Sequence, residues 1–188
     1  MLNIALFGPP GAGKGTQAKF LIDKFNLYHI STGDILRKEM ADKTELGLKA
    51  KDIIVGGGLV SDEIIAQIIE KVIKNNTGVN GFLFDGFPRT VAQAHLLQDI
   101  MGKLNTSLSL FLNIEVPEDE LVNRLILRGK LSGRVDDKED AIRTRLIEYN
   151  NKTLPVFNYF SDKVNCQTIN GFQDISKVAN DISQLIQI

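Results

Sequence analysis

Short apolar runs alternate with longer segments of helical periodicity along the whole chain. The apolar runs predict strands at residues 2–7, 27–30, 81–84, 108–114 and 163–169. The segments between them predict helices near residues 14–25, 34–42, 44–55, 62–74, 90–102, 118–128, 138–159 and 174–186. Pro155 is expected to kink or end the long helix that begins near residue 138. Strands that alternate with helices predict right-handed crossovers, and therefore an α/β fold with a five-stranded parallel sheet flanked by helices.

Two segments break this alternation. Residues 31–60 hold helices in succession with no strand between them, and Gly56, Gly57 and Gly58 lie near the end of the segment. This pattern predicts a helical lobe inserted in a single domain of 188 residues, with the glycines as its hinge. Residues 129–137 are short, polar and glycine-containing, and are predicted to be irregular. Both segments are candidates for moving parts, because loops over a triphosphate site often gate it.

A glycine-rich stretch, Gly8 to Gln17, follows the first predicted strand and precedes the first predicted helix. A phosphate-binding P-loop requires this context of strand, glycine loop and helix. The general P-loop pattern has Ser or Thr directly after its lysine, whereas here Gly15 stands there and Thr16 follows. The stretch predicts a nucleoside triphosphate site, in which Lys14 reaches the β- and γ-phosphates. Its backbone N–H donors are expected from Gly11, Ala12, Gly13, Lys14, Gly15 and Thr16, with the helix dipole behind them.

Three further features suit phosphate chemistry. Asp85 ends the third predicted strand, where P-loop proteins place a carboxylate that holds Mg²⁺, often through water. Arg89 follows it closely and is placed to grip a transferring phosphate. The segment from Ser31 to Asp34 is either a helix N-cap alone or, with Arg37 one turn later, an anion site at a helix start.

The arginines are segregated, whereas the lysines are spread along the chain. Five of the seven arginines lie in residues 124–145, and arginine forks suit bidentate phosphate contacts. Neighbouring acids leave two interpretations, solvated ion pairs or arginines aimed individually at phosphates, and the second is favoured. The net charge of −1 gives no bulk basic field, so neither a nucleic acid nor a membrane is expected as a partner.

Cysteine and histidine usage restricts the other chemistries. Cys166 is the single cysteine, which excludes a disulfide framework and a thiolate zinc site, and it is expected to be a small buried residue. His29 and His95 have no evident ligand or nucleophile partner and are interpreted as structural or surface residues. The N-terminal residues lack the pattern of a leader, and no apolar run approaches membrane-spanning length, so a cytoplasmic location is expected.

Four motifs, in this order along the chain, resemble those of the adenylate kinase family, within the nucleoside monophosphate kinases. They lie at residues 8–17, 31–37, 85–90 and 133–137. The resemblance implies a P-loop NTPase fold with a core (residues 1–30, 61–127 and 138–188), a monophosphate-binding lobe (31–60) and a short lid (128–137). Gly15 after the lysine is the family's own pattern. The lid has no cysteine and therefore looks like the short-lid type, which holds no zinc.

The same resemblance implies a role for each candidate site residue. ATP would be held by Gly11 to Thr16 together with Arg124, which would stack on adenine, Arg128 and the loop around Gln173. AMP would contact Thr32, Arg37, Gly58, Leu59, Val60, Gly86, Phe87, Pro88, Arg89, Gln93, Arg134 and Arg145. The catalytic residues would be Lys14, Arg89, Arg128, Arg134 and Arg145, and Asp85 would hold Mg²⁺ through water. Arg143 matches no contact of the family.

The implied activity is the reversible, Mg²⁺-dependent reaction ATP + AMP ⇌ 2 ADP, carried out by a monomer. A UMP/CMP kinase shares nearly every motif; Thr32, where pyrimidine-directed relatives typically carry alanine, and Gln93 favour AMP. An alternative from another class is a non-catalytic P-loop switch. A guanine-reading Asn-Lys-x-Asp motif would support it, but residues 151–154 lack the Asp. That alternative also leaves the arginines and the second lobe without a role.

Overall fold

The fold is built on a sheet of five parallel strands in the order β2-β3-β1-β4-β5. The computed structural model describes residues 1–76 and 78–186. This arrangement confirms the predicted α/β fold. β5 begins three residues later than predicted, because the backbone N–H groups of Lys163 and Val164 turn back onto the carbonyl of Phe160. The strands are β1 (Ile4–Phe7), β2 (Tyr28–Ser31), β3 (Phe82–Asp85), β4 (Leu110–Glu115) and β5 (Cys166–Asn170).

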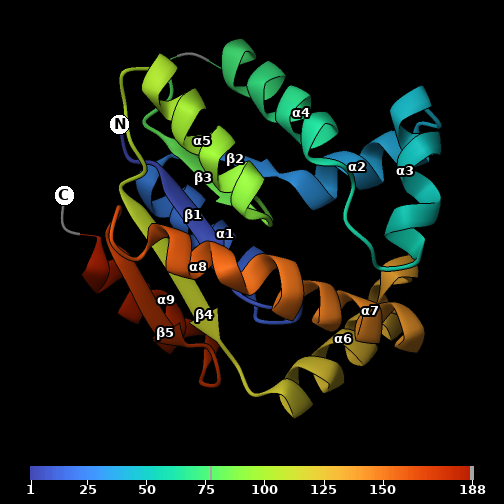
Figure 1. Ribbon diagram of the computed structural model, residues 1–188. Helices are drawn as coiled ribbons and strands as arrows, with labels where there is room; N and C mark the ends of the chain where they lie inside the picture. Colours follow the sequence, from blue (N-terminus) through green and yellow to red (C-terminus); the bar gives the residue numbers. More distant parts are fainter. Residues whose placement is uncertain (77, 187–188) are drawn as a thin grey trace.

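Alternate residues of each strand face two separate hydrophobic layers. In β1, Ile4 and Leu6 point to one layer and Ala5 and Phe7 to the other, as the two-residue period of a strand requires. Helices cover both faces of the sheet (Figure 1). The first layer is closed by α1 (Lys14–Phe25), α6 (Glu118–Ser132) and α9 (Ile175–Leu185), and the second by α4 (Asp62–Asn75), α5 (Val91–Lys103) and α8 (Leu154–Phe160).

Two helices, α2 (Thr32–Ala41) and α3 (Glu45–Val55), follow β2 directly and extend away from the sheet (Figure 1). Their starts are capped by side chains, since Ser31 accepts from the N–H of Asp34 and Thr44 from the N–H of Gly47. The two helices approach closely at Gly47, where a Cβ would lie 2.0 Å from the carbonyl oxygen of Glu39. Residues 31–60 therefore form a compact helical hairpin beside the sheet.

Helix α6 runs to Ser132, so the prediction that it ends near residue 128 and that residues 129–137 are irregular is wrong for residues 129–132. Gly129 does not stop the helix. It allows a close approach instead, because a Cβ there would lie 2.9 Å from the carbonyl oxygen of Asp137. The helix ends at Gly133, which has a left-handed conformation with φ of 64°. A short 3-10 turn, η1 (Val135–Asp137), completes the segment.

The predicted disturbance at Pro155 lies in the helical run from residue 139 to residue 160. The α-helix α7 (Glu139–Glu148) gives way to a π-helical segment, η2 (Tyr149–Thr153), and α-helix resumes as α8. Proline has no N–H to donate to the residue four positions before it and its ring crowds that carbonyl, so a wider turn there relieves both problems. The run continues beyond Pro155.

Residue 77, in the expected core segment 61–127, and residues 187–188, at the end of the segment 138–188, lie outside the described part of the chain. Within the part that is described, none of the helices combines the length and the apolar character needed to cross a membrane. Cys166 is only half-buried in β5, whereas the sequence predicted a small buried residue.

Candidate active site

The P-loop connects β1 to α1 and depends on glycine at two points. Gly8 has φ of 135°, and a Cβ there would lie 2.5 Å from the carbonyl oxygen of Ile114 on β4. Gly13 has φ of 93°, and its carbonyl accepts from the N–H groups of Thr16 and Gln17 at 3.0 and 3.1 Å, which starts α1. The loop therefore lies against the sheet and presents the N-terminus of α1 to the space in front of it.

Lys14 is partly buried, and its ammonium group bonds to the backbone of this loop. Its Nζ donates to the carbonyl oxygens of Gly8 and Pro9 at 2.8 and 2.9 Å. Burial lowers the pKa of Lys14 from 10.5 to about 7; Asp85 opposes this shift, and the nearby arginines, chiefly Arg89 and Arg145, reinforce it. The nearby negative charge is thus too small to stabilise the protonated form of Lys14 fully, and the negative charge of a bound phosphate would stabilise it.

A cleft of about 700 Å³ opens in front of the P-loop, and we call it the P-loop cleft. This volume is in the range of small-molecule sites. The chain segments around it come from both ends of the sequence and from the middle. Its lining includes residues 10–17, Asp85, Arg89, Arg124, Arg128, Arg134, Arg145, Gly171 and Gln173.

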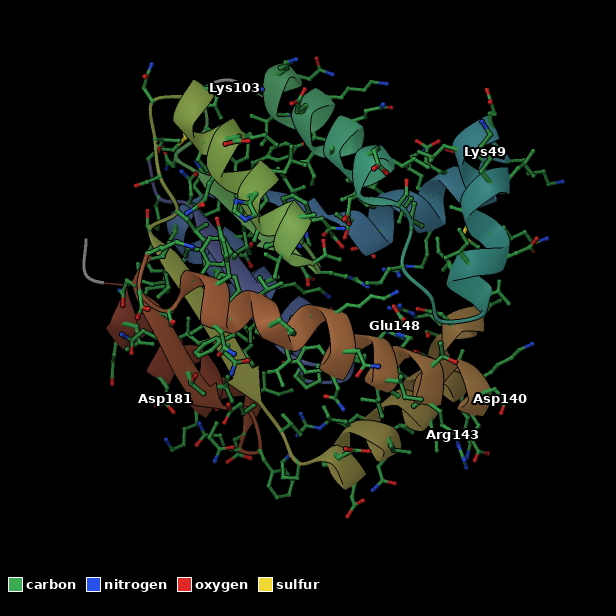
Figure 2. All side chains as sticks on the ribbon, in the orientation of Figure 1. Lys49, Lys103, Asp140, Arg143, Glu148 and Asp181 are labelled. Atoms are coloured by element: carbon green, nitrogen blue, oxygen red, sulfur yellow. The ribbon has the colours of Figure 1, made fainter. Side chains whose placement is uncertain are left out.

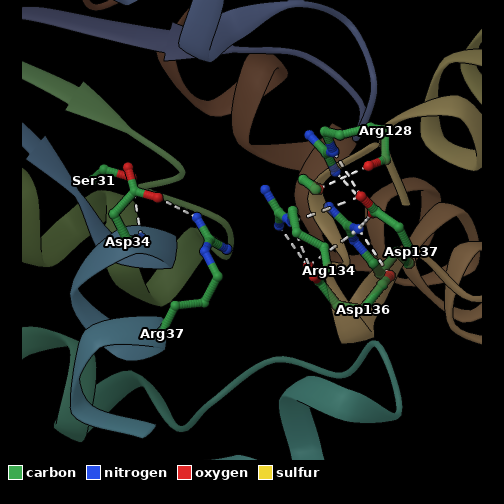
Figure 3. A network of polar contacts seen from close by, with 9 residues as sticks. Ser31, Asp34, Arg37, Arg128, Arg134, Asp136 and Asp137 are labelled. Carbon is green, nitrogen blue, oxygen red and sulfur yellow. Dashed lines mark hydrogen bonds and ion pairs between the residues drawn. The ribbon is translucent and has the colours of Figure 1, made fainter. Parts of the chain in front are cut away.

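Three of these arginines are held by two buried aspartates (Figure 3). Arg128 donates to both carboxylate oxygens of Asp137, at 2.6 and 2.8 Å, and Arg134 donates to those of Asp136 at 3.0 and 2.6 Å. Arg145 donates to the carboxylate of Asp137 at 2.6 Å and to the carbonyl of Asp136 at 3.0 Å. The arginines are therefore locked in place by a shared network rather than solvated singly.

The charges in this network shift one another's pKa. Burial alone would raise the pKa of Asp136, but the hydrogen bond from Arg134 and the charge of Arg145 outweigh it and lower the pKa to about 2. Burial lowers the pKa of Arg145 to about 10, against the opposing effect of both aspartates. Asp136 and Arg145 therefore both stay ionised at neutral pH. Arg143, by contrast, points outward from α7 and pairs with Glu139 at the surface (Figure 2).

A second, smaller hollow lies between the helical hairpin and the sheet, and we call it the lobe hollow. Its volume is about 70 Å³, below the roughly 300 Å³ of the smallest ordinary ligand sites. It adjoins the P-loop cleft, since Arg37, Arg89 and Arg145 border both. Its lining includes Thr32, Gly58, Leu59, Val60, Gly86, Gln93 and Arg134.

The backbone carbonyl of Gly86 holds two side chains that line this hollow. Its carbonyl oxygen accepts from the hydroxyl of Thr32 and from Nε of Arg89, both at 2.8 Å. Gly86 has φ of 76°, and a Cβ would lie 2.7 Å from Nη2 of Arg89, so glycine is required there. Two expected contacts lie elsewhere: the side chain of Phe87 is buried in the core, and Pro88 borders a neighbouring hollow instead.

Gln93 is held by a residue to which the sequence assigned no role in the site. Its Oε1 accepts from the N–H of Arg89 at 2.8 Å, and its Nε2 donates to Oδ1 of Asp62 at 2.7 Å. The hydroxyl of Thr90 donates to the same oxygen of Asp62. Asp62 therefore fixes which end of the Gln93 amide faces which way. The signal available in the sequence was only an acidic residue in the first turn of α4.

The segment from Ser31 to Asp34 combines the two interpretations that the sequence left open. Ser31 caps α2, and Arg37 pairs with the carboxylate of Asp34 at the border of both cavities. Figure 3 shows Asp34 and Arg37 facing the arginine–aspartate network across the cleft. An anion at this helix start would therefore lie between Arg37 and that network.

Asp85 lies at the carboxyl end of β3, where it borders the P-loop cleft with Thr16. Nε2 of His29 lies 3.8 Å from Oδ2 of Asp85, which is beyond hydrogen-bond distance, so His29 packs beside this carboxylate. Burial would raise the pKa of Asp85, but His29 and Lys14 outweigh it and lower the pKa. An ionised carboxylate beside a hydroxyl and a phosphate site fits Mg²⁺, which prefers a few protein oxygens and keeps several waters. Within residues 1–76 and 78–186, no cluster of three or more His, Cys, Asp or Glu side chains is placed to hold a metal ion.

Comparison with known proteins agrees with this geometry. The family profile described as "Adenylate kinase" matches residues 6–165. The chain belongs to the adenylate kinase family. An adenylate kinase of Bacteroides thetaiotaomicron is 44% identical over 186 residues, which cover 99% of this chain and 98% of that protein. One of Flavobacterium psychrophilum is 44% identical, with 99% and 98% covered, and one of Methanosarcina barkeri is 38% identical, with 99% of each chain covered.

Adenylate kinases are phosphotransferases of the nucleoside monophosphate kinase class, and the site has the charge that such chemistry requires. Every residue that the sequence assigned to ATP borders the P-loop cleft. Of the residues assigned to AMP, all but Phe87 and Pro88 border the lobe hollow. The residues that the sequence analysis missed are those that hold others in place: Asp62, Asp136 and Asp137.

The low pKa of Lys14 predicts a pH-dependent stability difference. Between about pH 7 and 10.5 the unfolded chain keeps the Lys14 proton that the folded chain has lost, so the wild type loses stability as the pH falls through this range. Below about pH 7 both states are protonated and the loss is complete. The Lys14→Met variant is therefore expected to gain melting temperature relative to the wild type as the pH falls from about 10 to 7. Thermal unfolding of the nucleotide-free proteins over this pH range measures the difference in melting temperature. Lys71→Met, on the exposed face of α4, is the control. Parallel plots of melting temperature against pH for all three proteins would contradict the lowered pKa of Lys14.

Proposed function

We propose that this protein catalyses the reversible transfer of the terminal phosphoryl group of ATP to AMP, giving two ADP. The observation that carries the proposal is the contact between the two cavities. Arg89, Arg134 and Arg145 border both the P-loop cleft and the lobe hollow. A phosphate held in either cavity would meet the same three guanidinium groups, which is the arrangement that transfer between two nucleotides needs.

The donor nucleotide is proposed to lie in the P-loop cleft. Its phosphates would accept from the backbone N–H groups of residues 11–16 and from Lys14. Its base would lie near Arg124, whose two terminal nitrogens donate to the carbonyl of Gly171 at 3.3 Å. The side chain of Gln173 is engaged by Asp181, so this residue would meet the base through its backbone.

The acceptor is proposed to be AMP, recognised at the lobe hollow. Arg37 and Arg89 would bind its phosphate, and the backbone of residues 58–60 would line the base. One N–H and one lone pair of the Gln93 amide remain available beyond its bonds to Asp62 and Arg89. Adenine offers an amino donor beside a ring-nitrogen acceptor, which complements that pair. A uracil edge offers the reverse order of oxygen acceptor and N–H donor.

The chemistry would rest on positioning and charge rather than on a general base. The attacking phosphate oxygen of AMP is already anionic, so no proton has to be removed. The obstacle is the repulsion between two polyanions, and the five cationic groups Lys14, Arg89, Arg128, Arg134 and Arg145 would offset it as charge develops in the transition state. Asp136 and Asp137 would keep three of these groups aimed at that point.

Adenylate kinases generally use ATP as its Mg²⁺ complex. In this chain, Asp85 and the Thr16 hydroxyl are the residues that would hold the ion beside the donor phosphates. When bound, Mg²⁺ neutralises phosphate charge and fixes the geometry of the triphosphate. A monomeric state and a cytoplasmic location stay predictions from the sequence.

Acceptor specificity is the direct test of the proposal. With ATP and Mg²⁺, the protein is expected to form ADP from AMP and far less from CMP or UMP. ADP formation with each acceptor in turn measures this. Robust turnover with CMP but not AMP would favour a UMP/CMP kinase, and no turnover with any acceptor would favour a nucleotide-binding switch.

A Lys14→Met variant is expected to fold but to lose about 10²–10³ in turnover, because removing other preorganised donors has an effect of this size. Near-normal turnover of Lys14→Met would contradict the role of Lys14.

The bond from Asp62 to Gln93 predicts a selective loss of acceptor affinity. Asp62→Ala frees the Gln93 amide to rotate, and a lost hydrogen bond to a charged group is worth about 1.5–3 kcal/mol. The KM for AMP is expected to rise about tenfold while the KM for ATP stays within about twofold. Glu63→Ala removes the neighbouring acid from the same helical turn and is the matched control. An equal rise in both KM values for Asp62→Ala would contradict a role at the acceptor base.

Gly57 carries the contact between the helical hairpin and α7. It has φ of 82°, and a Cβ there would lie 2.5 Å from the carbonyl oxygen of Ala141 and 3.1 Å from Cγ of Arg145. The lobe hollow in this structure is smaller than a nucleotide, so the hairpin would open to admit AMP and then close around it, which would bring Gly57 back toward α7 for transfer.

Gly57→Ala is expected to prevent this closure without unfolding the core. The KM for AMP should rise and kcat should fall, each about tenfold, with the KM for ATP nearly unchanged. Gly78→Ala is the matched control, because Gly78 has the same φ of 82° but a Cβ there would meet nothing within 4 Å. If both variants behave alike in steady-state kinetics, backbone strain rather than the contact explains the effect, and the closure is not supported.

A further inference from the structure

The loop of residues 171–175, which we call the base loop, joins β5 to α9 beside the P-loop cleft. Its large apolar side chains do not anchor it, because Phe172 and Ile175 are 56% and 57% exposed. Hydrogen bonds fix it instead. Arg124 donates to the carbonyl of Gly171, and Gln173 donates to Asp181 on α9, which lies at the outer surface (Figure 2). A loop with few buried apolar contacts depends on such bonds for its position.

One further bond reaches the base loop from the far end of the sequence. Nε2 of Gln17 donates to the carbonyl oxygen of Ile175 at 3.1 Å, across 158 residues. Gln17 is 4% exposed and belongs to the first turn of α1, where its own N–H bonds to the carbonyl of Gly13. The residue after Thr16 therefore connects the turn that holds phosphate to the loop beside the base.

The orientation of the Gln17 amide follows from its partner. A carbonyl oxygen only accepts, so the amide nitrogen must face Ile175 and Oε1 must face away from it. Oε1 is buried and has no hydrogen-bond partner in the structure. A buried acceptor without a partner is unfavourable, and a leucine of similar size would avoid it. What the glutamine contributes at this position is its N–H bond to the base loop.

We propose that Gln17 is a positioning residue for the donor base, acting through the carbonyl of Ile175. The proposal rests on the proposed function, in which the base of ATP lies against the base loop. Gln17 touches neither the reacting phosphates nor AMP in this scheme. Its loss therefore weakens donor binding and donor-base discrimination, and it leaves acceptor binding and the chemical step alone.

The test compares Gln17→Leu with Gln184→Leu, the same substitution at an exposed position of α9. We expect Gln17→Leu to raise the KM for ATP about tenfold and to lower the ratio of kcat/KM for ATP over GTP by a similar factor. The KM for AMP and kcat at saturating ATP should stay within about twofold, and Gln184→Leu should match the wild type. Melting temperatures are measured for each protein, so that a general loss of stability is seen separately.

A second variant keeps the shape and changes only the proton. Gln17→Glu places a carboxylate against the carbonyl of Ile175 at high pH, whereas the protonated acid can donate as the amide does. Burial raises the pKa of such a carboxyl, so protonation occurs nearer neutral pH. The KM for ATP of Gln17→Glu is expected to fall relative to the wild type as the pH is lowered from about 8 to 6. Melting temperatures of Gln17→Glu at both pH values show separately any recovery of stability, because protonation of a buried carboxylate also stabilises the fold.

Several outcomes would overturn the proposal. An unchanged KM for ATP in Gln17→Leu would do so, as would an equal rise in the KM for ATP and AMP or a loss confined to kcat. Arg124→Ala separates this failure from failure of the proposed donor site. If Arg124→Ala raises the KM for ATP and Gln17→Leu does not, only the role of Gln17 is wrong. If neither variant changes it, the base does not lie at the base loop and both proposals fail.

Discussion

Concentrated positive charge is the constraint on which the site depends. Lys14 and six arginines line one cleft, and burial and mutual repulsion lower the pKa of Lys14, Arg89 and Arg145. Asp136 and Asp137 offset part of this repulsion and are themselves buried, with their pKa values lowered. Like charges held this close are unfavourable until an anion arrives. Part of the binding free energy of a polyphosphate is therefore the repulsion that it relieves.

The sheet delivers these groups because the carboxyl ends of parallel strands meet at one edge. β1 leads into the P-loop, β3 ends at Asp85, and β4 leads to α6, which carries Arg124 and Arg128. The approach is tight enough that only glycine fits at residue 8, where the loop crosses Ile114 of β4. The position of the P-loop therefore depends on its packing against β4 as well as on its own glycines.

Much of this could be predicted from the sequence because the signals are local. Strand and helix order follows from hydrophobic period, and each phosphate motif lies within ten residues of sequence. The errors concern partners distant in sequence or glycines with two possible roles. Gly129 looks like a helix stop, but it serves the approach of Asp137, and Gly133 is the stop. The bond from Asp62 to Gln93 spans 31 residues, and no local pattern predicts it.

The position of Arg145 connects acceptor capture to the chemistry. A Cβ on Gly57 would lie 3.1 Å from Cγ of Arg145, so the helical hairpin packs against the Arg145 side chain. The guanidinium of the same side chain donates to Asp137. Closure of the hairpin and placement of Arg145 are then one event. Opening of the hairpin to admit an acceptor would remove this contact from Arg145, so the full set of cations would be closed off from water only once the acceptor is bound. A site built this way would favour transfer to a monophosphate over hydrolysis of ATP without a general base to choose between them.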